Sequence, residues 1–95
     1  MVLAVLGLNH KTVSVGIREK FSISEESARE GLLHLSEQAG IKEAVVLSTC
    51  NRTEIYAVLK DEEDKEELYR FFLTLSGNSK AEKEYFFFYT GTECI

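Results

Sequence analysis

The order of its apolar segments is the feature that most limits how this chain can fold. Residues 2–8 are almost continuously apolar and predict a strand that is buried on both faces. Residues 41–48 predict a second strand, residues 52–60 alternate like a half-buried third, and the aromatic residues 85–89 predict a fourth. Segments of helical periodicity separate the first strand from the second and the third from the fourth. This β-α-β-β-α-β order predicts an α+β, ferredoxin-like domain, with an antiparallel four-stranded sheet and two helices on one face.

The first helical segment is predicted to begin at Ser24, whose side chain can cap a helix, and to end at Gly40. Acidic residues directly after Ser24 suit the positive end of the helix dipole. Four residues recur at helical spacing and should form the buried stripe of this helix: Ala28, Leu32, Leu35 and Ala39. Before this helix, residues 17–20 predict only a short helical turn.

The second helical segment is predicted to begin at Asp61, which can cap it, and to end at Gly77. Its first turn is acidic, as the helix dipole favours. The apolar face that should pack on the sheet consists of Leu68, Phe71, Phe72 and Leu75.

Length, charge and cysteine content narrow the class of protein. The 95 residues are enough for one domain with a modest core, and two cysteines are too few for a disulfide framework. The apolar run at residues 2–6 is too short to span a bilayer and follows no basic segment, so we expect a cytoplasmic protein without a membrane anchor. The net charge of −5 and the scattered Lys and Arg residues argue against a surface that binds nucleic acid mainly through its phosphates.

Cys50 is the residue with the clearest chemical potential. It follows a predicted buried strand and precedes Arg52, whose charge can lower the pKa of a nearby thiol. Backbone amides of the turn around Cys50 and Asn51 could add dipoles and a place for a developing oxyanion. The alternative is that Cys50 is a small apolar residue at the end of a core strand. No His lies in the immediate sequence to act as its base, so a Cys-His pair would need a distant partner.

Two segments resemble a known enzyme family. Residues 7–12 read Gly-Leu-Asn-His-Lys-Thr and residues 46–56 read Val-Leu-Ser-Thr-Cys-Asn-Arg-Thr-Glu-Ile-Tyr. Together with residues 15 and 18–20, they closely resemble the N-terminal domain of glutamyl-tRNA reductase, in the same order and at similar spacing. The resemblance implies that Cys50 attacks the ester of glutamyl-tRNA and that NADPH reduces the resulting thioester to glutamate-1-semialdehyde, a precursor in tetrapyrrole (porphyrin) biosynthesis.

The same resemblance implies roles for the neighbours of Cys50. Thr49, Asn51 and Arg52 become the substrate-recognition stretch, and the planar guanidinium of Arg52 can bind a glutamate carboxylate through two parallel hydrogen bonds. The alternative for Arg52 is a surface ion pair with Glu54 on the same strand face.

Asn9 and His10 leave the predicted first strand at a sheet end. They become possible pocket-wall residues beside Cys50. For His10, solvation in a polar loop is the alternative.

Cofactor, domain and partner expectations follow from the resemblance. Residues 1–90 become the catalytic and glutamate-recognition domain, and residues 91–95 the start of a connection to an NADPH-binding domain that this chain lacks. No Gly-x-Gly-x-x-Gly occurs among the 6 glycines, so no cofactor should bind here. The general acid or base is expected beyond Ile95, where a histidine usually follows. The whole enzyme is expected to be a homodimer and is compatible with pairing to the downstream aminomutase.

Two other readings compete with an enzyme. A ferredoxin-like domain can serve as a non-catalytic module that binds a small molecule or RNA. The negative charge and the lack of interleaved basic and aromatic residues argue against the RNA form of that reading. A metal-handling domain is excluded because neither cysteine has a Cys or His at ligand spacing.

Overall fold

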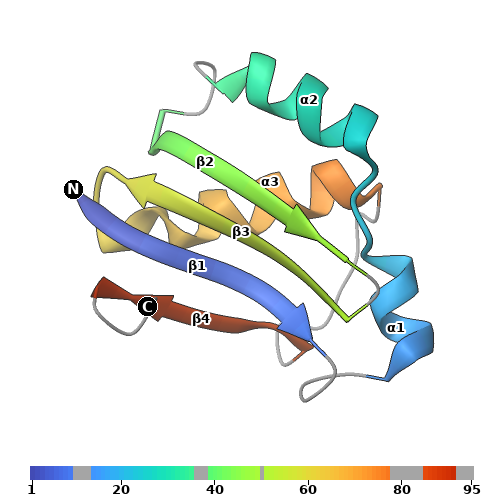
Figure 1. Cartoon of the computed structure of the whole chain (residues 1–95). Coiled ribbons are helices and arrows are strands. Elements are labelled where there is room, and N and C mark those ends of the chain that lie inside the picture. Colours follow the sequence, from blue (N-terminus) through green and yellow to red (C-terminus); the bar gives the residue numbers. More distant parts are fainter. Residues whose placement is uncertain (10–13, 36–38, 50, 78–84, 92–95) are drawn as a thin grey trace.

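Four strands of a computed structural model form one antiparallel sheet in the order β2-β3-β1-β4 (Figure 1). The structure describes residues 1–9, 14–35, 39–49, 51–77 and 85–91. The strands are β1 (Val2–Asn9), β2 (Ile41–Ser48), β3 (Arg52–Leu59) and β4 (Phe87–Thr90). The ferredoxin-like arrangement predicted from the order of apolar segments is confirmed.

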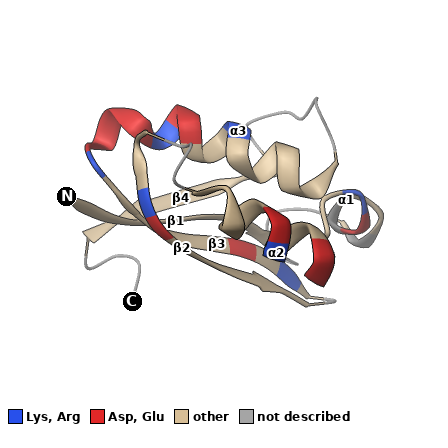
Figure 2. Ribbon diagram, turned by 90° about the horizontal axis from the view of Figure 1, so that it is seen from above, with Lys and Arg blue, Asp and Glu red and all other residues tan. Residues whose placement is uncertain are grey.

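The helices follow the predicted order along the chain. They are α1 (Val15–Lys20), α2 (Glu25–Leu33) and α3 (Lys65–Ser76), and α3 is preceded by a 3₁₀ turn, η2 (Glu62–Asp64). Seen along the sheet, α2 and α3 lie on the same side of the strands (Figure 2). None of the helices in the described ranges is long and apolar enough to cross a membrane.

The core lies between α3 and one face of the sheet. Side chains at alternate positions of β1 and β3 point to this face, and the register places Leu6 opposite Ile55. The apolar face predicted for α3 is confirmed, because Leu68, Phe71, Phe72 and Leu75 are all buried. The predicted end of this helix is also confirmed: Gly77 takes a left-handed conformation (φ 76°) directly after Ser76, as helix-ending glycines commonly do.

The prediction for α2 is partly wrong. Ser24 caps the helix, and its hydroxyl oxygen accepts the Ser27 N–H at 3.0 Å. The helix then ends at Leu33 instead of running to Gly40, and none of its residues is fully buried. From the predicted stripe, Ala28 and Leu35 pack against the core, whereas Leu32 and Ala39 are exposed.

Gly40 is buried and lies in the turn directly before β2 rather than at a helix end. Its N–H donates to Glu67 Oε2 at 2.8 Å, and its carbonyl accepts the Lys60 N–H at 2.9 Å. A side chain on Gly40 would collide with Asp64, because a Cβ there would lie 2.5 Å from Asp64 Cγ. A glycine fits at this position because the segments that carry Lys60, Asp64 and Glu67 all approach its backbone closely.

The predictions for two strands, β4 and β1, are partly wrong. β4 begins at Phe87 rather than Tyr85, because the Phe86 ring turns into the core and packs edge-on against three other rings: Phe21, Tyr69 and Phe72. The N-terminal strand is not buried on both faces along its length. Leu3 is exposed on the face away from the helices, whereas Val5 is buried there.

Candidate active site at the end of the β2–β3 hairpin

A tight turn joins β2 to β3 and carries the predicted recognition stretch. The strands pair as far as Ser48 and Thr53, and the Thr49 N–H then donates to the Arg52 carbonyl at 2.7 Å. The Thr49 hydroxyl donates to the same carbonyl at 3.3 Å and accepts the N–H groups of Asn51 and Arg52, each at 3.2 Å. Thr49 therefore organises the turn by bonding to the backbone on its far side.

The base of this turn is anchored to the helical layer. The Ser48 hydroxyl oxygen accepts the backbone N–H of Ile23 at 3.2 Å, and it lies 3.5 Å from the hydroxyl of Thr53. Ile23 and Thr53 are both buried. These contacts fix the end of the hairpin against the segment between α1 and α2.

Cys50 lies outside the described residues, between Thr49 and Asn51 in the sequence. The predicted oxyanion site would use backbone N–H groups of the turn around Cys50. The N–H groups of Asn51 and Arg52 are both used by Thr49 Oγ1 in this conformation. These two amides therefore hold the turn together instead of facing an open site.

Arg52 lies beside a nearly buried carboxylate on the face of the sheet away from the helices. Arg52 Nε is 3.8 Å from Glu54 Oε1, and the Tyr56 hydroxyl donates to the same oxygen at 3.1 Å. The Arg52 side chain is 52% exposed and that of Glu54 is 7% exposed. An ion pair this long, with its cation half in water, contributes little stability, so the guanidinium can exchange it for a ligand carboxylate at small cost.

The ion pair with Glu54, which the sequence offered as the alternative role of Arg52, is therefore present, whereas Tyr56 was given no role from the sequence. The spacing of these residues was the available sequence signal. Side chains two positions apart on a strand point to the same face, so Arg52, Glu54 and Tyr56 share one face of β3. Gly7 makes room for the carboxylate: a Cβ on Gly7 would lie 2.8 Å from Glu54 Cγ and 2.7 Å from the Thr53 backbone oxygen. The Gly7 in the first family-like segment therefore has a packing role next to the second segment.

The predicted pocket-wall residues are only partly described. Asn9 is the last residue of β1 and is the register partner of Arg52, so the backbone of Asn9 lies next to the recognition stretch. His10 lies outside the described residues.

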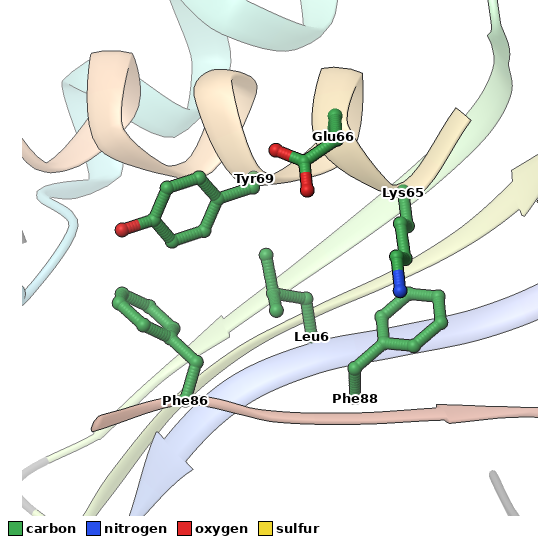
Figure 3. Close-up of a pocket in the computed structure, with 6 residues that line it drawn as sticks. All are labelled: Leu6, Lys65, Glu66, Tyr69, Phe86 and Phe88. Carbon is green, nitrogen blue, oxygen red and sulfur yellow. The ribbon is translucent and has the colours of Figure 1, made fainter. Parts of the chain in front are cut away.

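An apolar cavity of about 140 Å³ lies elsewhere, between α3 and the β4 edge of the sheet (Figure 3). Its lining includes Leu6, Tyr69 and Phe86, with Lys65 Nζ 6.0 Å from the centre of the Phe88 ring. Among the described residues, Thr49, Asn51 and Arg52 do not line it. Its volume is well below the roughly 300 Å³ at which pockets for drug-sized ligands begin.

The described residues do not fit a dinucleotide or a metal. Dinucleotide-binding folds place a glycine-rich turn between a strand and a helix N-terminus to approach the phosphates. The described glycines with positive φ are Gly77 and Gly91, which follow α3 and β4 respectively. Nor do the described His, Cys, Asp and Glu side chains form a group of three that could hold a metal ion.

Comparison with known proteins identifies relatives of the whole chain. The family model described as "Glutamyl-tRNAGlu reductase, N-terminal domain" matches residues 6–95. A glutamyl-tRNA reductase of Synechocystis sp. is 50% identical over 78 residues, which cover 82% of this chain and 18% of that protein. A glutamyl-tRNA reductase of Thermodesulfovibrio yellowstonii is 41% identical over 104 residues, covering 100% of this chain and 24% of that protein.

A solved structure shares the fold. Glutamyl-tRNA reductase from Methanopyrus kandleri superimposes with a TM-score of 0.65 at 24% sequence identity, over 96% of this chain and 19% of that chain. The chain therefore spans about a fifth of the length of the proteins that it matches.

Proposed function

Because the chain belongs to the glutamyl-tRNA reductase N-terminal domain family, we propose that it forms the thioester-generating part of an NADPH-dependent glutamyl-tRNA reductase in tetrapyrrole biosynthesis. In this proposal, residues 1–90 form the catalytic domain and residues 91–95 begin the connection to the cofactor domain. The whole enzyme is a cytoplasmic homodimer that can hand its aldehyde to an aminomutase. The proposed substrate is glutamyl-tRNA, after which the family is named.

Cys50 is the proposed nucleophile. Its thiolate attacks the carbonyl carbon of the ester that joins glutamate to the tRNA. A carbon–sulfur bond forms, the bond to the ribose oxygen breaks, and that oxygen takes up a proton as the tRNA leaves. NADPH, which would be bound by the rest of the polypeptide, would supply a hydride to the carbonyl carbon of the thioester. The carbon–sulfur bond would then break, which would release glutamate-1-semialdehyde and regenerate the Cys50 thiolate.

The neighbouring residues would position the substrate. Arg52 is proposed to bind a carboxylate of the glutamyl group, and its guanidinium would exchange the long ion pair with Glu54 for this ligand. Thr49 holds the backbone of the turn, and the exposed Asn51 is proposed to contact the substrate. Asn9 and His10 are proposed to line the same pocket. The group that protonates the leaving oxygen is assigned to residues beyond Ile95.

One observation carries the proposal: Thr49 holds the backbone of Arg52 at the hairpin turn that contains Cys50 in sequence, and the guanidinium of Arg52 is half exposed there. A cation at this place favours thiolate over thiol. In the full-length enzyme, iodoacetamide at neutral pH should therefore modify Cys50 well before Cys94, as mass mapping of the peptides would show. Glutamyl-tRNA should slow the modification of Cys50 and leave Cys94 unaffected. Equal rates at the two cysteines would remove the physical basis of the proposal.

The cofactor assignment has its own test. The described glycines form no phosphate cradle, so the 95-residue chain alone should show no saturable NADPH binding by calorimetry, while the full-length enzyme should bind it. Saturable binding to the 95-residue chain would place the cofactor site here instead.

A further inference from the structure

The face of the sheet opposite α2 and α3, which we call the open face, is built from cross-strand rows of side chains. One row crosses all four strands, because the register aligns Val45, Tyr56, Val5 and Tyr89. The next row aligns Leu47, Glu54, Gly7 and Phe87 in the same strand order. The open face is defined here by these two rows together with Leu3 and Val58, which pair with each other.

This face is too apolar for a permanently solvated surface. Val45 is 65% exposed, Tyr89 45% and Leu3 42%. Antiparallel sheets with one face in water normally carry polar side chains on that face. The Lys, Arg, Asp and Glu residues of the chain gather largely on the helices (Figure 2), although the register also places Glu43, opposite Val58, and Glu54 on the open face. A contiguous apolar patch of this kind marks an interaction surface.

The open face carries a shallow hollow and a pair of aromatic rings. The hollow, of about 200 Å³, is lined mainly by apolar residues such as Leu3, Val45 and Val58, with Glu43 in its lining on the edge strand β2. At the other side of the rows, the rings of Phe87 and Tyr89 lie with centroids 5.4 Å apart and form a shared apolar surface. The hollow can accept an apolar side chain, and the ring pair offers a flat surface for packing.

We propose that a segment of the same polypeptide that follows residue 95 covers the open face in the complete enzyme. The matched region covers 18% and 24% of two relatives, and the family is described as an N-terminal domain, so most of their length follows this domain. The apolar row of Val45, Tyr56, Val5 and Tyr89 resembles a core cut in half, which is typical of permanent contacts rather than transient ones. A covalently connected segment reaches such a face at a high effective concentration.

A segment that covers the open face would also lie close to the candidate active site, because of the position of Arg52. Arg52 lies on the same face, next to the row that contains Glu54. A segment packed over the rows would therefore form a second wall beside the guanidinium. The docking itself does not depend on thioester chemistry, so its test is independent of the proposed function.

Site-specific photo-crosslinking tests the proposal in the full-length enzyme. A photo-crosslinking amino acid replaces Val45, which is exposed enough to be changed without disturbing the core. The matched control replaces Leu33, which is 74% exposed on α2, in the layer on the other side of the sheet. Crosslinked products are separated by size and mapped by mass spectrometry.

The expected product from position 45 is an intramolecular crosslink to a peptide beyond residue 95. Its yield should be severalfold above that of the same peptide from position 33 and should not change on dilution. A crosslink to a second copy of the chain, a crosslink to bound RNA, or a yield no higher than from position 33 would overturn the proposal.

Discussion

Thr49 and Arg52 are joined by three hydrogen bonds across the turn that contains Cys50 in sequence. The Thr49 N–H and hydroxyl donate to the Arg52 carbonyl at 2.7 and 3.3 Å, and the Arg52 N–H donates to Thr49 Oγ1 at 3.2 Å. The backbone of Arg52 is thereby held while its side chain stays half exposed. Thr49 thus gains a backbone-organising role besides the substrate contact predicted for it.

Replacing Thr49 by Val tests this role. Valine keeps the branched shape but cannot accept the N–H groups of Asn51 and Arg52. We expect a stability loss of only about 1 kcal/mol, because the residue is exposed, but a large fall in thioester formation as the turn loosens. Thermal unfolding and single-turnover kinetics of the full-length enzyme measure the two effects. Thr49→Ser, which retains the hydroxyl, should stay close to the parent; equal losses in both variants would rule out the hydrogen-bonding role.

Replacing Arg52 by Lys tests carboxylate recognition. Lysine keeps the charge but loses the planar fork that binds a carboxylate through two bonds. We expect kcat/KM for glutamyl-tRNA to fall by roughly 10- to 100-fold, the equivalent of about 1.5–3 kcal/mol for a charged hydrogen bond. Arg29→Lys on the exposed side of α2 is the matched control and should have no effect. Near-normal kinetics in Arg52→Lys would mean that its ion pair with Glu54 is its main role.

Replacing Gly7 by Ala tests the close packing between β1 and Glu54. The new methyl group would lie 2.7 Å from the Thr53 backbone oxygen, which cannot move without distorting β3. We expect a stability loss of about 1–3 kcal/mol by urea unfolding, the usual range for overpacking. Gly16→Ala is the control, because a Cβ there meets nothing within 4 Å, and in α1 it should be neutral or slightly stabilising. An unchanged Gly7→Ala variant would show that the strands adjust freely.

The sequence predicted some elements well because their signal is local. The buried face of α3 repeats at helical spacing and is closed by Gly77, so its four core residues and its end were predicted correctly. Gly40 looked like a helix end, yet its conformation is decided by contacts with Asp64, Glu67 and Lys60, all distant in sequence. Periodicity cannot reveal such contacts.

At the candidate site, too, the features with a local sequence signal were predictable and those set by distant contacts were not. The hairpin turn around Cys50 was predicted from strand ends and a family-like motif, and the strands do end there. The approach of Gly7 to Glu54 was not predictable, because it depends on the register between β1 and β3. A shift of that register by one residue would turn Glu54 and Tyr56 to the opposite face.

The central claim is that Cys50 carries the glutamyl group as a thioester, and a trapping experiment measures this directly. Full-length enzyme is mixed with tRNA charged with radiolabelled glutamate in the absence of NADPH, then denatured in acid. The account predicts protein-bound label that hydroxylamine releases, that maps to the Cys50 peptide, and that persists in Cys94→Ser but is absent from Cys50→Ser. Label that survives in a folded Cys50→Ser variant, or that maps to another residue, would contradict the claim.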